Sequence, residues 1–380
     1  MRVVHLIKAK GIAGAERHLL DLLPGLRTHG VDPYVVLIAE PNNTADTMEA
    51  AIREINVPVE RVAIYRHFEP GLYRVLRDVL LRLQPQIVHT HLMHADVHGI
   101  PAAKWAGVPR IISTRHDDDP ARTRQPLRTV YGGLWRLTDA GIAISEAIKR
   151  FCIEVEHAPP HKVHVVYHGM PLPVAQIDRT AARQSLAAEL HLPPDMLFVG
   201  DTLFVGMVCR LMEAKGIPDA LEAFAQVRDA YPNAHFVIAG DGPLRDAIEA
   251  QIATLNLTDR VHLLGWRDEP LRVVAALDLL LMPSTREGFG MTLLEAMSQS
   301  VPVIGSTASA IPEVILNNET GLTVPPNDPD ALADALRRLL SDAALRQRFG
   351  QMGRERLEKQ FNAQRMIDET FAVYQRVYRP

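Results

Sequence analysis

The sequence has very little cysteine. Among its 380 residues, Cys152 and Cys209 are the two that carry a thiol. Two cysteines cannot build a disulfide framework, and by themselves they cannot complete a zinc site. This scarcity is typical of proteins that work in a reducing compartment, so we expect a cytoplasmic protein.

Long apolar runs are also missing. A membrane-spanning helix needs about 18 or more apolar residues in succession, and no such stretch occurs here. The chain begins M-R-V-V-H-L-I-K-A-K, where the apolar run is too short for a signal peptide and lysines follow it immediately. We therefore expect no transmembrane span, while attachment to the cytoplasmic face of a membrane stays open.

An excess of charge of one sign is absent as well. Lysine and arginine total 41 against 45 aspartates and glutamates, which gives a net charge of −4. This balance excludes nucleic acid as a bulk electrostatic partner. The turn after the first apolar run, K-G-I-A-G-A-E-R from Lys10, does not have the pattern G-x-G-x-x-G. A nicotinamide oxidoreductase is disfavoured for that reason.

What the sequence does contain is a repeated alternation of short apolar runs and amphipathic stretches, which predicts parallel sheets covered by helices. The predicted strands of the first half are 3–7, 34–39, 59–65, 87–91, 110–114, 140–145 and 163–167. Its predicted helices are 15–26, 47–55, 72–83, 127–137 and 146–155. The strands of the second half are 203–210, 235–239, 261–265, 279–283, 301–305 and 321–324. Its helices are 217–230, 244–256, 271–276, 291–300, 312–317, 329–340 and a last region, 343–378.

The length is too great for one ordinary core, so we expect two domains. We predict a Rossmann-like domain at 1–175, a linker rich in proline and charge at 176–200 with one short helix at 181–190, and a second Rossmann-like domain at 201–360. Residues 361–380 are expected as a C-terminal helix. A ligand cleft between two such domains is the expected site.

The stretch S-T-R-E-G-F-G-M-T-L-L-E-A-M, residues 284–297, carries the strongest chemical signal. Gly288 and Gly290 leave room for a ligand at the start of a helix, where free backbone N–H groups bind a phosphate. Glu287 and Glu295 flank that point, and carboxylates accept hydrogen bonds from sugar hydroxyls. A nucleotide diphosphate sugar satisfies both needs. The alternative is a solvated Glu287 and a Glu295 that the helix dipole stabilises by about 0.3–1 kcal/mol.

Basic residues follow the first strand of the second half. In V-G-M-V-C-R-L-M-E-A-K-G, Arg210 ends the predicted strand and Lys215 precedes Gly216. Two cations at the carboxyl end of a strand neutralise a pyrophosphate and stabilise a departing nucleotide diphosphate. Taken alone, this pair favours an ordinary helix-entry loop; together with residues 284–297 it favours a donor site.

Histidines and glycines crowd the strand ends of the first half. Gly11 and Gly14 make a tight turn that brings backbone close to a donor phosphate or to an acceptor. His116 follows a predicted strand and is expected to face the cleft. A metal site at His89, His91 and His94 is disfavoured, because we expect strand alternation to send these side chains to different places. The run Asp117–Asp119 is expected as a solvated loop.

These motifs resemble those of the retaining glycosyltransferases of family 4, which have the two-Rossmann GT-B fold, an α/β fold. The resemblance covers nearly the whole chain. It rests on E-x7-E (Glu287 to Glu295), R-L-x-x-x-K-G (Arg210 to Gly216), G-D-G-P from Gly240, G-I-A-G-A-E-R, and V-V-Y-H-G-M, where the family more often has asparagine in place of His168.

The resemblance implies transfer with retention of the anomeric configuration, without a metal or other cofactor. It implies that Arg210 and Lys215 grip the diphosphate, Glu295 the ribose and Glu287 the donor sugar, with His116 near the reacting sugar. The residues that it assigns to catalysis are His116, Arg210, Lys215 and Glu287. Those assigned to the donor are Gly14, Arg210, Lys215, Gly240, Glu287, Gly288, Phe289, Gly290, Met291, Thr292 and Glu295. Those assigned to the acceptor are His91, Arg115 and His116.

The function that follows is a hexosyltransferase that moves a sugar from a UDP- or GDP-linked donor to a hydroxyl of a glycan, a lipid-linked acceptor or a small molecule. The alternatives are a nucleotide-sugar epimerase or hydrolase, and a non-catalytic nucleotide-sugar-binding protein. A basic and aromatic region in the first half bears on the membrane question. For this region we favour an aromatic face packed in the core over contact with anionic lipid. Its residues are Arg115, Arg122, Arg124, Arg128, Tyr131, Trp135 and Arg136.

Overall fold

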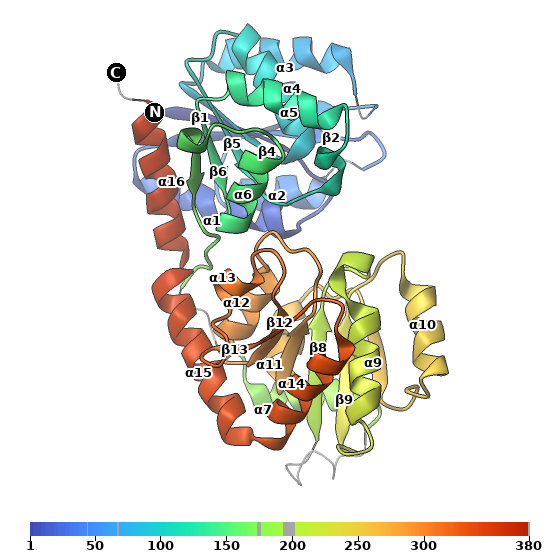
Figure 1. The fold of residues 1–380 in the computed structure, drawn as a ribbon. Coiled ribbons are helices and arrows are strands. Elements are labelled where there is room, and N and C mark those ends of the chain that lie inside the picture. Colours follow the sequence, from blue (N-terminus) through green and yellow to red (C-terminus); the bar gives the residue numbers. More distant parts are fainter. Residues whose placement is uncertain (44, 67, 173–175, 193–201, 379–380) are drawn as a thin grey trace. The chain divides into compact units, whose positions relative to one another are not determined.

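The computed structural model describes residues 1–378 except 44, 67, 173–175 and 193–201. The chain divides into two compact units (Figure 1). The first unit combines Met1–Pro171 with Phe361–Pro380, and the second is Leu172–Gln360. The predicted linker 176–200 lies partly outside the described residues. Its short helix is α7 (Arg179–Glu189), and it belongs to the second unit.

The described part of the first unit contains a seven-stranded, fully parallel sheet in the order β3-β2-β1-β4-β5-β6-β7. Its strands are β1 (Arg2–Lys8), β2 (Asp32–Ala39), β3 (Val59–Ala63), β4 (Ile87–His91), β5 (Arg110–Arg115), β6 (Ala140–Ala143) and β7 (Val163–Val165). Every predicted strand of this half is confirmed to within about two residues at each end. The strands are rich in Val and Ile because both faces of a parallel sheet are buried.

The helices of the first unit include one that the sequence pattern missed. They are α1 (Gly14–Thr28), α2 (Asp46–Glu54), α3 (Pro70–Leu83), α4 (Leu92–Trp105), α5 (Leu127–Leu137), α6 (Glu146–Glu154) and α16 (Ala363–Val377), with 3₁₀ turns η1 (Pro120–Thr123) and η2 (Pro160–Lys162). The missed helix is α4. It contains Pro101, and its buried residues include the polar Asp96 and His98. Its sequence therefore lacks the regular spacing of apolar residues that indicates an amphipathic helix.

The second unit contains a six-stranded parallel sheet in the order β10-β9-β8-β11-β12-β13 among the residues described. Its strands are β8 (Leu203–Val208), β9 (Ala234–Ala239), β10 (Val261–Gly265), β11 (Leu279–Met282), β12 (Val303–Ser306) and β13 (Gly321–Val324). Its helices after α7 are α9 (Ile217–Val227), α10 (Arg245–Thr254), α11 (Pro270–Ala276), α12 (Met291–Ser298), α13 (Ile311–Val314), α14 (Pro329–Ser341) and α15 (Ala343–Gln360), with the 3₁₀ turn η3 (Glu213–Lys215).

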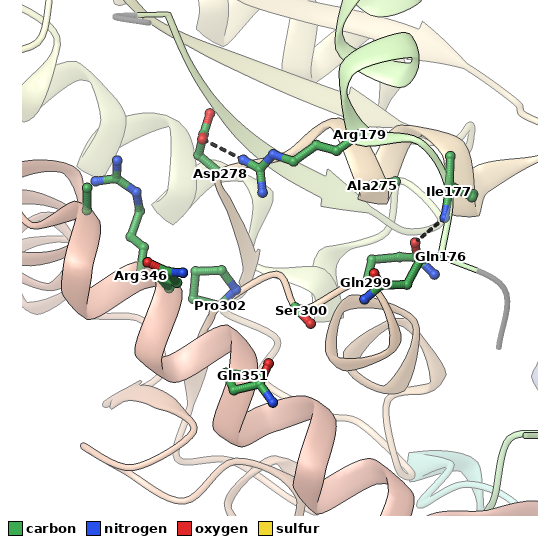
Figure 2. Close-up of a pocket in the computed structure, with 12 residues that line it drawn as sticks. Gln176, Ile177, Arg179, Ala275, Asp278, Gln299, Ser300, Pro302, Arg346 and Gln351 are labelled. Carbon is green, nitrogen blue, oxygen red and sulfur yellow. Dashed lines mark hydrogen bonds and ion pairs between the residues drawn. The ribbon is translucent and has the colours of Figure 1, made fainter. Parts of the chain in front are cut away.

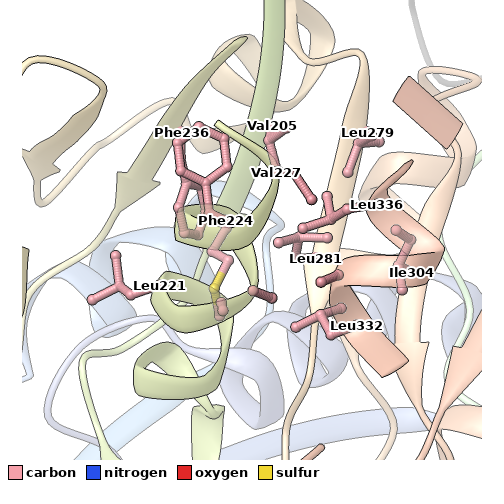
Figure 3. Packing of buried hydrophobic residues seen from close by; sticks show 14 of the residues in the cluster. Val205, Leu221, Phe224, Val227, Phe236, Leu279, Leu281, Ile304, Leu332 and Leu336 are labelled. Atoms are coloured by element: carbon pink, nitrogen blue, oxygen red, sulfur yellow. The ribbon is translucent and has the colours of Figure 1, made fainter. Parts of the chain in front are cut away.

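The largest core of the second unit lies between its sheet and the helices α9 and α14. Figure 3 shows Phe224 of α9 beside Phe236 of β9, and Leu336 of α14 beside Leu281 of β11. All four side chains are buried. Burying a large apolar side chain contributes about 1.5–3 kcal/mol, so this face of the sheet anchors the strands whose ends carry the candidate site.

The last helical region, 343–378, is two helices, and the second of them lies within the C-terminal helix expected at 361–380. Helix α15 ends at Gln360, and α16 begins after Asn362, whose side chain accepts a hydrogen bond from the N–H of Arg365 at 2.9 Å. An asparagine cap of this kind starts a new helix. Helix α16 packs on α1 and buries Tyr374 in the first unit (Figure 1).

No helix of the described residues combines sufficient length with sufficient apolar character to cross a bilayer.

Candidate active site

The second sheet changes direction between β8 and β11. From β8 the strand order runs back through β9 to β10, and from β11 it runs on through β12 to β13. In parallel sheets, ligands bind beside the carboxyl ends of the two strands at such a switch point. The two sequence motifs follow these two strands: Arg210 and Lys215 come after β8, and Ser284–Gly290 come after β11.

The fold brings Lys215 and Glu287 into contact. The Lys215 Nζ lies 2.6 Å from Glu287 Oε2, although 72 residues separate them in the chain. Both side chains remain partly accessible, at 23% and 15% exposed. The Glu287 carboxylate therefore holds the Lys215 ammonium in place by a charge-assisted hydrogen bond. Of the four residues assigned to catalysis, these two are the pair in direct contact.

Backbone contacts fix the loops that carry this pair. The Thr285 N–H donates to the Ala214 carbonyl at 2.9 Å. Gly216 has φ +65°, and a Cβ there would lie 2.3 Å from the Pro283 carbonyl oxygen. Only glycine fits that close approach. Gly216 therefore holds the turn after Lys215 against the end of β11.

The N-terminus of α12 opens at Gly290, which caps the helix with φ +91° and has no capping side chain. Free N–H groups in this first turn are suited to a phosphate. The Phe289 side chain is buried, and the Thr292 hydroxyl donates to the Val208 carbonyl at 3.2 Å. Neither side chain is therefore available to bind an anion, because one is buried and the other already donates its hydroxyl hydrogen.

The remaining predicted donor residues of this unit divide into two kinds. Gly288, Met291 and Glu295 are half-buried around the start of α12, whereas Arg210 is exposed. Arg210 makes no hydrogen bond or ion pair with another residue that the structure describes. An unengaged guanidinium at a strand end is available for a diphosphate.

Two predicted donor glycines have different roles. Gly240 has φ +138°, and a Cβ there would lie 1.9 Å from the Cys209 carbonyl oxygen. Its lack of a side chain is explained by packing, without any ligand. Gly14 belongs to the first unit, where it is exposed at the start of α1, and a Cβ there would meet nothing within 4 Å.

In the first unit, buried histidines gather on the face of the sheet that α16 covers. His91 Nδ1 lies 3.2 Å from His116 Nε2, and His91 Nε2 lies 3.1 Å from His5 Nδ1. His89 bonds Tyr374 of α16 and the Thr114 hydroxyl, both at 2.7 Å. Burial lowers the pKa of each of these histidines, so they are neutral at pH 7.

The structure corrects two acceptor assignments. His91 is fully buried, and both of its ring nitrogens are engaged by other histidines. Arg115 is 2% exposed and forms ion pairs at 2.9 Å with Asp96 and with Glu156. A ligand cannot reach either side chain directly. Sequence reasoning failed here because the partners of Arg115 are distant in the chain.

The basic and aromatic region is confirmed as core-packed. Tyr131 and Trp135 are buried, and the Arg115 guanidinium lies over both rings at 4.8 and 5.0 Å. The same network holds Arg122, which bonds Glu156 Oε1 at 2.8 Å and Asp117. The aromatic face of the region is therefore packed in the core, whereas Arg124 and Arg136 are exposed.

The histidines of β4 do not point to different places, as was expected from strand alternation. His89 and His91 are two residues apart on β4, so they share a face of the sheet, and His5 of β1 lies beside them. His94 lies apart from them, 3.3 Å from Lys8 Nζ. One ring nitrogen from each of His5, His89 and His91 lies within 4.8 Å of the others. Both nitrogens of His89 and of His91 already make hydrogen bonds. A metal ion would have to break them, so the cluster suits a hydrogen-bonded network better.

A cavity of about 440 Å³ lies in the second unit away from these motifs. Figure 2 shows Asp278, Ser300 and Pro302 around it, next to the starts of β11 and β12. Arg179 donates to Asp278 at 2.7 Å across one wall. The cavity is at the amino ends of the strands, whereas the predicted donor residues are at the carboxyl ends.

Comparison with known proteins agrees with this geometry. Sequence profiles described as "Glycosyl transferases group 1" and "Glycosyltransferase Family 4" match residues 192–356 and 12–172. The lipopolysaccharide core biosynthesis glycosyltransferase LpsE of Rhizobium meliloti is 30% identical over 372 residues, which is 97% of each chain. The UDP-Gal:α-D-GlcNAc-diphosphoundecaprenol α-1,3-galactosyltransferase of Escherichia coli is 26% identical over 390 residues, 98% of this chain and 96% of that one.

A solved structure shows the same fold. Anabaena Alr3699/HepE, crystallised in complex with UDP and glucose, has a TM-score of 0.85 over 99% of this chain and 100% of that chain, at 20% identity. The α/β architecture of two Rossmann-like domains, known as GT-B, is confirmed. The chain belongs to glycosyltransferase family 4, the glycosyl transferases group 1.

Proposed function

We propose that the protein transfers a hexosyl group from a UDP- or GDP-linked sugar to an acceptor hydroxyl, with retention of the anomeric configuration. Membership of the glycosyltransferase family supports the transfer of a sugar from a nucleotide sugar. The observation that carries the site assignment is the contact between Lys215 and Glu287 beside the uncapped N-terminus of α12. The cations and the backbone N–H groups there suit a diphosphate, and the carboxylate suits the hydroxyls of the sugar joined to it.

Each group has a defined task in this proposal. Lys215, Arg210 and the first N–H groups of α12 bind the diphosphate, because it carries the negative charge. Glu287 accepts hydrogen bonds from donor-sugar hydroxyls and holds Lys215 in position. Glu295, in the second turn of α12, accepts from the ribose diol.

The same cations promote the chemistry. When the glycosidic bond breaks, the leaving nucleotide diphosphate gains negative charge, and positioned cations stabilise that charge in the transition state. We propose that the acceptor attacks from the face that the phosphate leaves, and that a phosphate oxygen receives the acceptor proton. Two cationic side chains and a helix N-terminus supply the neutralisation that a divalent ion would otherwise provide, so the reaction is proposed to be metal-independent.

Exposed aromatic residues of the first unit favour an acceptor that is lipid-linked and lies at a membrane face. The first unit exposes Tyr65, Phe68 and Trp105, which are 72%, 59% and 55% accessible, around helix α3. The exposed Arg74 lies on the same helix, and Arg77 stacks over Trp105 at 4.7 Å. Aromatic side chains mixed with arginines bind anionic bilayers. The related Escherichia coli galactosyltransferase is named for a diphosphoundecaprenol acceptor.

The decisive experiment measures ligand binding and then product stereochemistry. Thermal unfolding is recorded with each common UDP- and GDP-sugar, because a ligand that binds only the folded state raises the melting temperature. We expect one sugar of the panel to stabilise the protein, with and without a chelator. Proton NMR of the product from that donor should show the donor's own anomeric configuration.

Four outcomes would contradict the proposal. An inverted product refutes retention, and reversible loss of activity in chelator refutes metal independence. Consumption of the donor without an acceptor, yielding an epimer or a free sugar, would identify the epimerase or hydrolase alternative. Binding without any turnover would identify a non-catalytic binding protein.

A further inference from the structure

The cavity at the amino ends of β11 and β12 is lined by segments that are distant in the sequence. Helix α7 begins there with Arg179, Asp278 comes directly before β11, and Gln299 ends α12 (Figure 2). Helix α15 completes the lining. All of these segments belong to the second unit. The volume of about 440 Å³ lies within the range of about 300–1,000 Å³ that is typical of ligand pockets.

Helix α15 turns a polar side towards this cavity. Its lining residues are spaced by three or four positions, which places them on one side of the helix. They are Ala343, Arg346, Gln347 and Gln351. The apolar residues that α15 buries are others, including Leu345, Phe349 and Leu357. A helix that presents arginine and glutamine to a cavity of its own unit suits a polar ligand there.

Positive charge exceeds negative charge around the cavity. Asp278 is the acid among the described lining residues, and it accepts from Arg179 at 2.7 Å and from Arg183 at 2.8 Å. Arg346 donates through Nη1 to two backbone carbonyls of α14, and it forms no ion pair with any residue that the structure describes. Three guanidinium groups therefore share one carboxylate.

The pKa of Arg179 agrees with this excess of positive charge. Burial lowers it, and the neighbouring charges of Arg183 and Arg346 lower it further, against the opposing effect of the carboxylate. Asp178 and Asp342 do not compensate, because their carboxylates cap α7 and α15 and neither residue is among those lining the cavity. A bound anion would relieve the repulsion between the arginines.

The lining also distinguishes between kinds of anion. The amide groups of Gln176, Gln347 and Gln351 donate and accept hydrogen bonds, as sugar hydroxyls do. None of the described lining residues is aromatic, so a nucleobase would find no ring on which to stack. Guanidinium groups bind a phosphate through paired hydrogen bonds. The combination suits a sugar that carries a phosphate.

We propose that this cavity binds a hexose phosphate. Arg346 and Arg179 hold its phosphate, and the glutamine amides hold its hydroxyls. The site is separate from the predicted donor site, which lies at the carboxyl ends of the strands whose amino ends border the cavity. It does not rest on the proposed function.

Isothermal titration calorimetry of the full chain at low salt tests the ligand. We expect glucose 6-phosphate or glucose 1-phosphate to bind, and glucose not to bind at the same concentration. Inorganic phosphate should bind at least about tenfold more weakly, because it lacks the hydroxyls. Absence of binding by both sugar phosphates overturns the proposal. Equal affinity for inorganic phosphate, or for glucose, overturns it as well.

Two substitutions locate the bound ligand. Arg346→Gln removes a cation, and Gln347→Glu adds a carboxylate to the wall, so each should weaken binding at least about tenfold. Arg348→Gln is the matched control, because Arg348 is exposed on the same helix and does not line the cavity. It removes the same charge as Arg346→Gln and should leave the affinity unchanged. Unchanged affinity in both cavity variants, or an equal loss in the control, refutes the site.

The predicted donor site is the competing location, since a sugar phosphate shares two groups with a nucleotide sugar. Lys215→Met should leave the affinity unchanged. A loss in Lys215→Met without a loss in Gln347→Glu places the ligand at the donor site and refutes the cavity. If Arg346→Gln does not fold, Gln347→Glu decides, because this exposed side chain makes no hydrogen bond with another described residue. If no nucleotide sugar binds, the proposed function fails and the cavity result stands.

Discussion

Lys215 and Glu287 form the contact on which the donor site depends. Replacement of Lys215 by methionine keeps the length of the side chain and removes its charge, so the leaving diphosphate loses one stabilising cation. We expect kcat to fall about 10²- to 10³-fold. Steady-state rates with the donor found in the binding screen measure the effect. Arg245→Met is the control, since Arg245 makes a surface ion pair with Glu249 on α10; an equal loss in both variants would refute the site.

Glu156 is a second residue whose role is clear from its contacts. It is fully buried and accepts from Arg115, Arg122 and Trp135. Glu156→Gln preserves the shape but leaves two buried arginines short of a counter-charge. We expect a loss of about 3–5 kcal/mol in stability.

Urea unfolding with a probe in the first unit measures this loss. The control is Glu146→Gln, because Glu146 is half-exposed and its ion pair with Lys149 spans 3.9 Å. Exposed pairs contribute about 0–1 kcal/mol. Equal midpoints for the two variants would contradict a structural role of the buried network.

The limits of sequence prediction are clearest at these side chains. Arg115 sits in a run that is basic and aromatic, yet its burial depends on Asp96 and Glu156, which lie 19 and 41 residues away. Nothing local marks those partners. His91 was misassigned for a related reason, because its neighbour His5 comes from another strand. By contrast, Lys215 and Glu287 were expected to lie near each other, and they are in contact because both follow strands whose ends meet at a switch point.

Among the loops and helices, the turn at Gly216 offers a sharp test. Gly216 and Gly265 have nearly equal φ values, +65° and +69°, so an alanine is strained at both. A Cβ at Gly216 also collides with the Pro283 carbonyl, whereas one at Gly265 meets nothing within 4 Å. We expect Gly216→Ala to lower kcat at least tenfold more than Gly265→Ala, because the collision displaces the turn after Lys215. Similar activity of the two variants would show that the turn tolerates this displacement.

The exposed face around α3 predicts membrane binding. Phe68→Ala combined with Trp105→Ala should weaken co-sedimentation with vesicles containing anionic lipid, and added salt should weaken it further. Vesicles of zwitterionic lipid should bind little of either protein. Trp266→Ala is the control, since Trp266 is 71% exposed in the second unit. Loss of binding in the control alone would place the membrane contact elsewhere.

Most helices and strands followed from periodicity because an alternating α/β chain repeats one pattern many times. Helix α4 was not predicted, because Pro101 and its buried polar residues obscure that pattern. Helices α15 and α16 meet close to residue 361, where the C-terminal helix was expected to begin, and the local signal there is one cap, Asn362. Single caps and buried proline helices are set by tertiary packing, which a periodicity does not report.

Taken over the entire chain, the buried histidines predict sensitivity to acid. Burial lowers the pKa values of a group in the first unit: His5 to about 3, His18 to about 4, and His89, His91, His116 and His168 well below 6.5. A folded-state pKa below the unfolded value gives stability that is complete above pH 6.5 and is lost as pH falls towards 4. Each pKa unit corresponds to about 1.4 kcal/mol.

Four carboxyls have the opposite effect on the pH dependence, because burial raises the pKa values of Glu16, Asp21, Asp96 and Asp219. Burial raises the pKa of Asp21 to about 6, so its contribution to stability grows as pH falls from 6 to 3.8. The six histidines outnumber these four carboxyls, and we expect the melting temperature to fall steadily between pH 6.5 and 4.5. Thermal unfolding across this range tests the prediction. A melting temperature that stays level or rises would show that the histidines take up protons without unfolding the unit.

Residues 361–380 complete the unit that residues 1–171 begin, with Met366, Ile367 and Tyr374 among its buried side chains. A ribosome therefore starts this half first and supplies its final piece last, after the entire other half has been synthesised. Until α16 is synthesised, Leu22 and Leu26 of α1 lack the apolar side chains that pack against them in the folded unit. A chain that stopped between the two segments would leave this apolar surface exposed, which makes it a target for chaperones.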